Sequence, residues 1–141
     1  MKKTAKKVLS AVLVVCLLIA GVGAYASESS VASLYSIMWT HINALGAGLS
    51  IGTWGYSTCS ASLELTNSSD TSTMYMYLQR YVNGSWTYVT SWSTSGSEDL
   101  SLAENYYVTS GYYYRVHVIA HVYTSGTLVE TATQDSNSVY Y

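Results

Sequence analysis

The strongest constraint on the fold is an alternation of apolar and polar residues that covers most of the chain. Segments rich in Tyr, Val, Thr and Trp show this period of two, and clusters of Asn, Gly, Ser and Asp separate them. Successive side chains of a β-strand point to opposite faces of the sheet, so the pattern is typical of strands with one buried face. The predicted strands are 44–51, 56–66, 73–82, 85–93, 99–102, 112–123 and 128–134.

These segments predict the fold class and the domain organisation. Seven strands with no helical stretch among them favour an all-β domain, an antiparallel sandwich of about seven strands. A β-barrel is the alternative. Residues 27–43 are expected to form a lead segment, of which 31–43 fits either a short helix or a leading strand. Residues 44–141 are expected to form the single sandwich domain.

The first 26 residues differ from the rest and predict a signal peptide helix. Four of the six basic residues precede an apolar run at 8–24, and Ala24-Tyr25-Ala26 supplies a cleavage site with small residues. An uncleaved anchor is the alternative, although a run of about 17 residues interrupted by Ser10 is short for a membrane span. The expected location is therefore extracellular, as a secreted protein or one associated with the cell surface.

The charge that remains after residue 26 excludes one class of partner. Arg80 and Arg115 are then the only basic residues besides three histidines, while all eight acidic residues remain, so the net charge is about −6. A nucleic-acid-binding face needs several Lys or Arg side chains to neutralise phosphates. The composition predicts no nucleic-acid partner, and membrane contact only through the signal peptide before cleavage.

The dipeptide Asn83-Gly84 predicts a hairpin and sets its register. It lies between two alternating segments, and a type I′ turn needs the positive φ that Asn and Gly tolerate. The expected cross-strand pairs are Tyr81–Trp86, Gln79–Tyr88, Leu78–Val89, Tyr77–Thr90 and Tyr75–Trp92. One face would then suit the core, with Met74, Met76, Leu78 and Val89. The other would carry an aromatic strip, with Tyr75, Tyr77, Tyr81, Trp86, Tyr88 and Trp92.

Segment 112–123 divides between two faces in the same way. The face expected in the core carries Tyr114, Val116, Val118, Ala120 and Val122. The opposite face carries Tyr113, Arg115, His117, Ile119, His121 and Tyr123. A hairpin closed by Ser125-Gly126 would place His121 opposite Glu130, unless a glycine bulge shifts the register by one residue.

The sequence resembles a family of small secreted proteins of Gram-positive bacteria, a domain of unknown function, in two stretches: LQRYVNGSWTYVTSW at 78–92 and YYVTSGYYYRVHVIAHVY at 106–123. The resemblance extends over about residues 39–133. The strand-turn-strand pattern of these stretches is similar to that of immunoglobulin-like and fibronectin type III-like modules, in which a Gly-Tyr-x-Tyr-Arg-Val run opens the penultimate strand. The resemblance implies an immunoglobulin-like β-sandwich in which Tyr112 or Tyr114 serves as the corner tyrosine. It implies no activity.

Motifs that would indicate catalysis or metal binding lack the context that their chemistry needs. Residues 48–52, GLSIG, match the nucleophile elbow of hydrolases, but that motif requires a strand, a tight turn and a helix in an α/β sheet. His117 and His121 would lie about 13 Å apart on one strand, at about 3.3 Å per residue, which is too far to share one ion. Adjacent Glu98 and Asp99 would point to opposite faces rather than form an acid–base pair. We therefore expect no enzyme, no catalytic residue, no metal site and no cofactor.

Cys59 is the only cysteine after residue 26, so no intrachain disulfide is expected there. Its neighbours alternate between apolar or small and polar residues, which predicts a buried strand position. A leftover thiol that pairs between molecules or acts as a nucleophile is the alternative.

The expected function depends on the aromatic face. If the two long hairpins adjoin, their outward residues form one continuous platform, made of Tyr75, Tyr77, Tyr81, Trp86, Tyr88, Trp92, Tyr113, Arg115, His117 and Tyr123. An exposed apolar patch of this kind marks a binding site or an interface. The sequence favours an extracellular, non-catalytic binding module for a glycan, the cell wall or a protein.

Two other interpretations of this face remain open. The protein would be a self-associating structural component of a cell surface or biofilm if the same face packs on a second copy. A hydrolase is a more distant alternative. The face would not be free if Trp86 or Trp92 is a core tryptophan, or if residues 31–42 fold across it.

Overall fold

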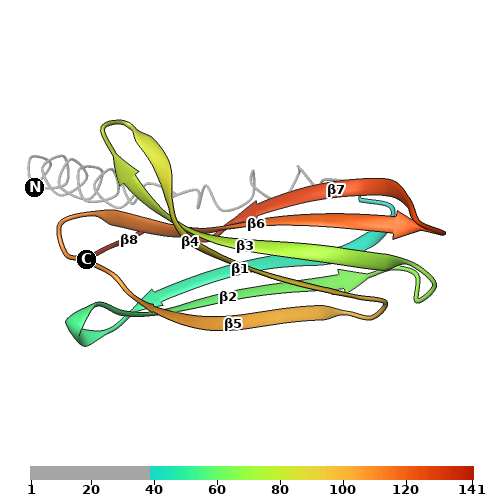
Figure 1. Cartoon of the computed structure of the whole chain (residues 1–141), viewed down its shortest axis with the longest axis horizontal. Helices are drawn as coiled ribbons and strands as arrows, with labels where there is room; N and C mark the ends of the chain where they lie inside the picture. Colours follow the sequence, from blue (N-terminus) through green and yellow to red (C-terminus); the bar gives the residue numbers. More distant parts are fainter. Residues whose placement is uncertain (1–38) are drawn as a thin grey trace, which may run out of the picture. The chain divides into compact units, whose positions relative to one another are not determined.

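Within the residues that the structure describes, the seven alternating segments and one further short strand form eight β-strands, arranged in two antiparallel sheets (Figure 1). The computed structural model describes residues 39–141, so the predicted signal peptide and most of the lead segment lie outside the described residues. A 3₁₀ turn, η3 (Thr53–Gly55), joins the first two strands. The strands are β1 (Ile42–Ile51), β2 (Tyr56–Leu65), β3 (Thr71–Val82), β4 (Ser85–Gly96), β5 (Leu100–Tyr107), β6 (Tyr113–Thr124), β7 (Thr127–Asp135) and β8 (Val139–Tyr140).

The two sheets face each other as a sandwich, which confirms the predicted fold class. The smaller sheet has the order β1-β2-β5 and the larger has the order β4-β3-β6-β7, with the short β8 also paired to β6. In Figure 1 the layer of β7, β6 and β3 lies above the layer of β2 and β5. The chain therefore crosses repeatedly between sheets, and each sheet keeps one face for the core.

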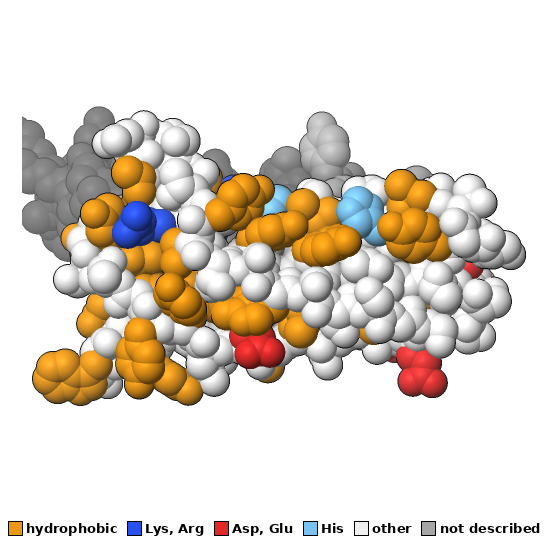
Figure 2. Space-filling model, viewed as in Figure 1, with side chains coloured by type: hydrophobic (Ala, Val, Ile, Leu, Met, Phe, Trp, Pro, Cys, Tyr) orange, Lys and Arg blue, Asp and Glu red, His pale blue; other side chains and the backbone are white. Residues whose placement is uncertain are grey.

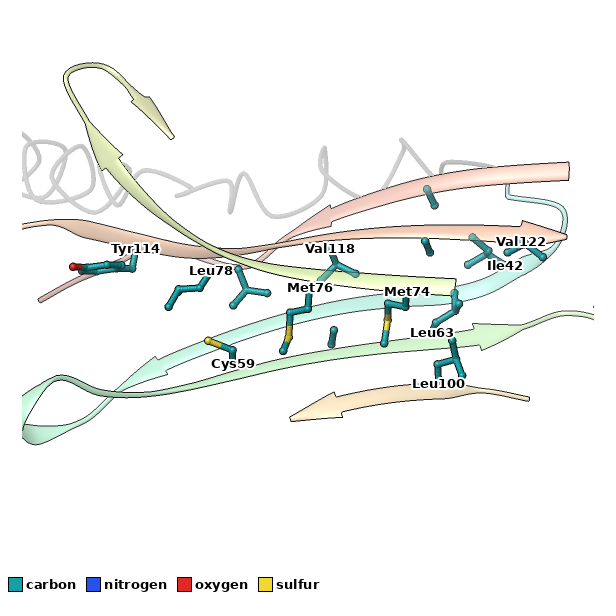
Figure 3. Close-up of a cluster of buried hydrophobic side chains, with 14 of the residues drawn as sticks. Ile42, Cys59, Leu63, Met74, Met76, Leu78, Leu100, Tyr114, Val118 and Val122 are labelled. Carbon is teal, nitrogen blue, oxygen red and sulfur yellow. The ribbon is translucent and has the colours of Figure 1, made fainter. Parts of the chain in front are cut away.

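The core fills the space between the two sheets. Figure 3 shows Met74, Met76 and Leu78 pointing from β3 toward Cys59 and Leu63 of β2. The face of 112–123 that was expected in the core is buried in full, from Tyr114 to Val122 at alternate positions. Each fully buried aliphatic side chain contributes about 1.5–3 kcal/mol, so packing between the sheets is the main source of stability.

The hairpin of β3 and β4 has the predicted turn but only part of the predicted register. Asn83 and Gly84 have φ values of 50° and 83°, as a type I′ turn requires, and the expected pairs Tyr81–Trp86 and Gln79–Tyr88 are confirmed. A β-bulge then shifts the register by one residue. The expected pairs Leu78–Val89, Tyr77–Thr90 and Tyr75–Trp92 are wrong, and the observed pairs are Leu78–Thr90, Tyr77–Ser91, Met76–Trp92 and Tyr75–Ser93.

The hairpin of β6 and β7 also contains a bulge near its turn. Ser125 and Gly126 both have positive φ, and the register shifts between Val122 and Tyr123. The predicted pair of His121 and Glu130 is therefore wrong, because His121 lies opposite Thr131.

Glu130 has a different structural role at the start of β1. Its carboxylate accepts hydrogen bonds from the backbone N–H groups of Thr40, His41 and Ile42, each at 2.9 Å. These three bonds hold the beginning of β1 against β7, across the edge of the sandwich. β1 accordingly begins at Ile42, inside the range 27–43 that was expected to be a lead segment.

Two strands extend well past their expected ends, and one further strand was not expected. β5 continues to Tyr107, five residues past the expected end at 102. β4 continues to Gly96, and β8 was not predicted. The extensions are polar or consist of Tyr pairs, so they carry little alternation by which a strand is recognised.

A second anchor beside β1 centres on the Asp70 carboxylate. The side chain is 2% exposed; one oxygen accepts a hydrogen bond from Thr124 Oγ1 at 2.7 Å, and the other lies 2.8 Å from His41 Nδ1. The bond from Thr124, followed by that from His41, holds the pKa of Asp70 below its ordinary 3.8, although burial acts in the opposite direction. The loop before β3, the end of β6 and the start of β1 are thus joined through one ionised group.

We expect the Asp70→Asn variant to unfold more easily than the wild type at neutral pH. Because the folded-state pKa of Asp70 is lowered, its carboxylate stabilises the fold above the unfolded-state pKa, and this contribution disappears as the pH falls through the folded value. Urea unfolding of both proteins from neutral to acidic pH measures the effect. The gap between the two should narrow in acid, and parallel profiles would contradict the assignment. Thr124→Val is the control that removes the first hydrogen bond and keeps the charge.

Candidate functional site

The outer face of the larger sheet carries nine of the ten residues that were predicted to form a platform. They project from β4, β3 and β6 on the side of the sheet opposite the core, and in most of β3 and β6 they alternate with buried residues. We call these nine residues the aromatic platform: Tyr75, Tyr77, Tyr81, Trp86, Tyr88, Tyr113, Arg115, His117 and Tyr123. The tenth, Trp92, does not belong to it.

Trp92 faces the core because of the β-bulge in β4. It lies opposite Met76, which is buried, and its side chain is partly buried against the core cluster. A one-residue shift in register moves every following side chain to the other face of the sheet. The expected place of Trp92 on the aromatic strip is therefore wrong, and the alternative in which it is a core tryptophan describes it better.

Ring contacts connect the middle of the aromatic platform across three strands. The Tyr77 ring is 5.0 Å from that of Tyr88 and 6.4 Å from that of Tyr75, which it stacks at 20°. It also lies 6.3 Å from the His117 ring, and Tyr75 meets His121 edge to face at 5.8 Å. Figure 2 shows hydrophobic and histidine side chains side by side along the upper edge, over the layer that contains β3 and β6. The rings in the middle of the platform therefore contact one another from β4 through β3 to β6.

Arg115 organises the neighbouring part of the aromatic platform. Its Nε donates to Gln79 Oε1 at 2.8 Å, and its guanidinium donates to Asp135 Oδ2 at 2.7 Å. The guanidinium carbon lies 4.5 Å from the centre of the Trp86 ring, which also contacts Tyr81 at 5.1 Å. The other oxygen of Asp135 is hydrogen-bonded to His117 Nδ1. Because the single arginine is paired, the face offers rings and hydroxyl groups with little net charge.

Three members of this surface were missed from the sequence. Gln79 lies on the predicted outer face by parity, but only its amide contact with Arg115 gives it a role. Asp135 is one residue past the expected end of the last strand, and Tyr140 lies in β8. The Tyr140 ring packs on that of Tyr113 at 5.0 Å and extends the surface at one end. These groups join the surface because strands that are distant in the sequence pair with each other. Local alternation does not encode this pairing.

The aromatic platform is an exposed surface rather than a cleft. Tyr88 is 67% exposed, and Tyr81, Tyr113 and Tyr140 are also exposed, while the rings between them are half-buried. A cavity of about 520 Å³ lies elsewhere, between the loops at 65–68 and 97–99. No platform residue lines it. A surface of this shape suits an extended or flat ligand better than a small molecule that must be enclosed.

In the part of the chain that the structure describes, the residues considered as catalytic candidates take part in strand pairing and hydrogen bonds that support the fold. Ser50 lies in β1 opposite Thr58, with no helix following it. His121 Nδ1 is 3.0 Å from Thr131 Oγ1, and Asp99 accepts the backbone N–H of Leu65 at 2.9 Å. Among residues 39–141 no three His, Cys, Asp or Glu side chains are grouped as a metal site would require. These residues therefore add no second site to the aromatic platform.

Cys59 is a fully buried residue of β2, as the alternation predicted. Burial raises the pKa of its thiol to about 11, and the hydrogen bond with Ser57 offsets only part of this rise. The thiolate is the reactive form, so a thiol with this pKa is inert at neutral pH.

We expect Cys59 to resist alkylation by iodoacetamide in the folded protein and to react fully in urea. Peptide mass spectrometry after a timed exposure measures the labelled fraction. Thr58→Cys is a matched control, because its side chain lies on the exposed face of the same strand and should react at once. Equal rates at positions 58 and 59 would show that β2 is not packed as described.

The sequence matches no protein-family model and no curated protein. Among the described residues no helix is long and apolar enough to cross a membrane.

Proposed function

We propose that this protein is a secreted, non-catalytic β-sandwich that binds an extracellular ligand through the aromatic platform. The observation that carries the proposal is the set of ring contacts on the outer face of β4, β3 and β6, with one group around Tyr77 and a second between Tyr81 and Trp86. Rings that only filled space would lie in the core, whose fully buried part here is made of aliphatic side chains, methionines, Cys59 and Tyr114. Exposed patches of this kind usually mark recognition surfaces.

The chemistry of the aromatic platform favours a ligand of low charge. Tyrosine and tryptophan offer flat apolar faces for stacking, and tyrosine adds a hydroxyl group at the ring edge for hydrogen bonds. Arg115 is paired with Asp135, so no unpaired cation on this face attracts an anionic ligand. A neutral glycan of the cell wall or of a host surface has low charge and can both stack on the rings and hydrogen-bond with the hydroxyl groups. An uncharged protein surface meets the requirement for low charge.

The architecture supports an immunoglobulin-like assignment of the sandwich. The hydroxyl of Tyr114, near the start of β6, donates to the backbone carbonyl of Thr109 at 2.7 Å. This is the hydrogen bond of a tyrosine corner, which in such domains lies at the start of the penultimate long strand. Tyr114 rather than Tyr112 takes this role, because the Tyr112 ring instead faces Arg80. The strand orders of three and four, with crossings between sheets, are also those of the fibronectin type III-like modules that the sequence resembles.

Self-association is the second candidate function, and it is favoured by the position and composition of β4. This strand is at the edge of the larger sheet, is 12 residues long, and contains no charged residue and no proline. Natural edge strands usually carry such residues, because an unprotected edge pairs with strands of other molecules. A second copy added at β4 would extend the aromatic platform across both molecules.

The decisive experiment measures molecular mass and ligand retention on the same preparation. Light scattering on the secreted protein over a wide concentration range reports self-association. Retention on insoluble cellulose, chitin and peptidoglycan reports binding. A constant monomer mass together with retention on one of these polymers supports the binding module. A mass that rises with concentration, without retention on any polymer, would replace it with the structural protein.

A further inference from the structure

A small cavity opens at one end of the sandwich, where β5 leads into β6. Its volume is about 140 Å³, and Arg80 reaches it from the inner side of β3. Val89 and Val108 form the apolar part of its wall, and Tyr106, Tyr107, Thr109 and Tyr114 form the remainder. The cavity shares no residue with the aromatic platform.

Arg80 is a cation without a counter-charge in the described part of the chain. Its Nε atom is buried and has no hydrogen-bond partner. The arginine that forms an ion pair in this part of the chain is Arg115. The guanidinium carbon lies 4.4 Å from the centre of the Tyr112 ring, in a cation–π contact. Arg80 lines the cavity and has no anionic partner there, so a group that accepts hydrogen bonds from its guanidinium would be favourable in this position.

The β-bulge in β4 contributes to the same cavity. Tyr88 pairs with Gln79 and Thr90 pairs with Leu78, which leaves Val89 between them without a partner in β3. Bulges redirect side chains and are frequent beside binding sites. Here the extra residue lines the cavity next to Arg80.

We propose that this cavity binds the carboxylate group of an acidic sugar. A carboxylate accepts two parallel hydrogen bonds from a guanidinium, and Arg80 supplies the guanidinium in the lining of this cavity. The volume is well below the ~300 Å³ of a pocket that encloses a whole small ligand, so it receives one group of a larger molecule. The domain is acidic overall, so Arg80 provides a local positive charge that attracts a carboxylate.

The rim of the cavity explains why the carboxylate belongs to a sugar. Tyr107 is 68% exposed, and its ring meets that of Tyr56 edge to face at 5.2 Å. These rings offer a flat apolar face and hydroxyl groups immediately outside the cavity, as a sugar ring requires. A hexuronic acid combines the ring and the carboxylate in one unit.

An NMR titration of the ¹⁵N-labelled secreted protein tests this site. The probes are D-glucuronate and D-glucose, which differ at the carboxylate, and N-acetylalanine and its amide, which present a peptide carboxylate and its neutral match. The readout is the Nε–H resonance of Arg80, assigned by its loss in Arg80→Lys. This titration uses the wild-type protein, so it does not depend on the folding of any variant.

We expect glucuronate to move the Arg80 resonance and glucose to leave it in place. Arg80→Gln should weaken glucuronate binding at least tenfold, judged from the amides of Val108 and Thr109. Ser101→Glu changes the net charge by the same amount on an exposed position of β5 and should leave the affinity within twofold. A response to N-acetylalanine without one to glucuronate would overturn the sugar as the source. No response to either acid, or an equal response to glucose, would overturn the site.

Discussion

Alanine at both Tyr81 and Tyr88 is expected to abolish retention on whichever polymer holds the wild-type protein. Both rings are among the exposed members of the aromatic platform, and they flank its contacts with Trp86 and Tyr77. Residues that dominate an interface each cost about 2 kcal/mol or more when truncated, and each 1.4 kcal/mol is a tenfold change in affinity. The double variant should therefore bind at least about 100-fold more weakly.

The fold should survive this double substitution, because neither ring contributes to the buried core. Urea unfolding is the check that loss of retention is not loss of structure. Trp54→Ala is the matched control: it removes an aromatic side chain that is 87% exposed but lies on η3, away from the larger sheet. Retention that disappears in Trp54→Ala and persists in the double variant would move the binding site off the aromatic platform.

The faces of the strands could be predicted from the sequence because alternation is a local property. Burial at every second residue of β6 follows directly from the order of residues between Tyr113 and Thr124. The turn at Asn83 and Gly84 could be predicted for a similar reason, since two adjacent residues determine its backbone. These two signals were enough to place nine residues of the aromatic platform on one face.

The bulges could not be predicted because the sequence on both sides of them remains compatible with a regular strand. In β4 the residues Val89, Thr90 and Ser91 are each accepted on either face of a sheet. Which of them is left unpaired is decided by the fit of Met76 and Trp92 in the core, a contact between two strands. Glu130 was misplaced for the same kind of reason, since its partners lie about 90 residues earlier.

The sequence contains a signal for the cavity around Arg80, which is the position of this residue within its strand. Arg80 has the same parity in β3 as Met74, Met76 and Leu78, so alternation alone places this charged residue on the inner face. A charge at an inward position needs either a partner or a site. What the sequence does not contain is the position of β5 and of the loop at 108–112, which complete the wall.

The two tryptophans of β4 should respond in opposite ways to replacement by alanine. Trp92→Ala should lower the free energy of unfolding by about 3 kcal/mol, the lower end of the range for a large aromatic side chain removed from a core, because Trp92 is only partly buried. Trp86→Ala should cost less than about 1 kcal/mol, because it removes contacts at the surface with Tyr81 and Arg115. Urea unfolding of both variants measures the difference.

This comparison also tests the bulge that separates the two faces of β4. Without the bulge Trp86 and Trp92, six residues apart, would share a face, and both variants would change ligand retention and stability alike. With the bulge, Trp86→Ala should weaken retention and Trp92→Ala should affect it only as far as the domain unfolds. A variant of Trp92 that is stable but no longer retained would return this residue to the outer face. The bulge therefore decides both the extent of the aromatic platform and the wall of the Arg80 cavity, since it turns Trp92 inward and leaves Val89 beside Arg80.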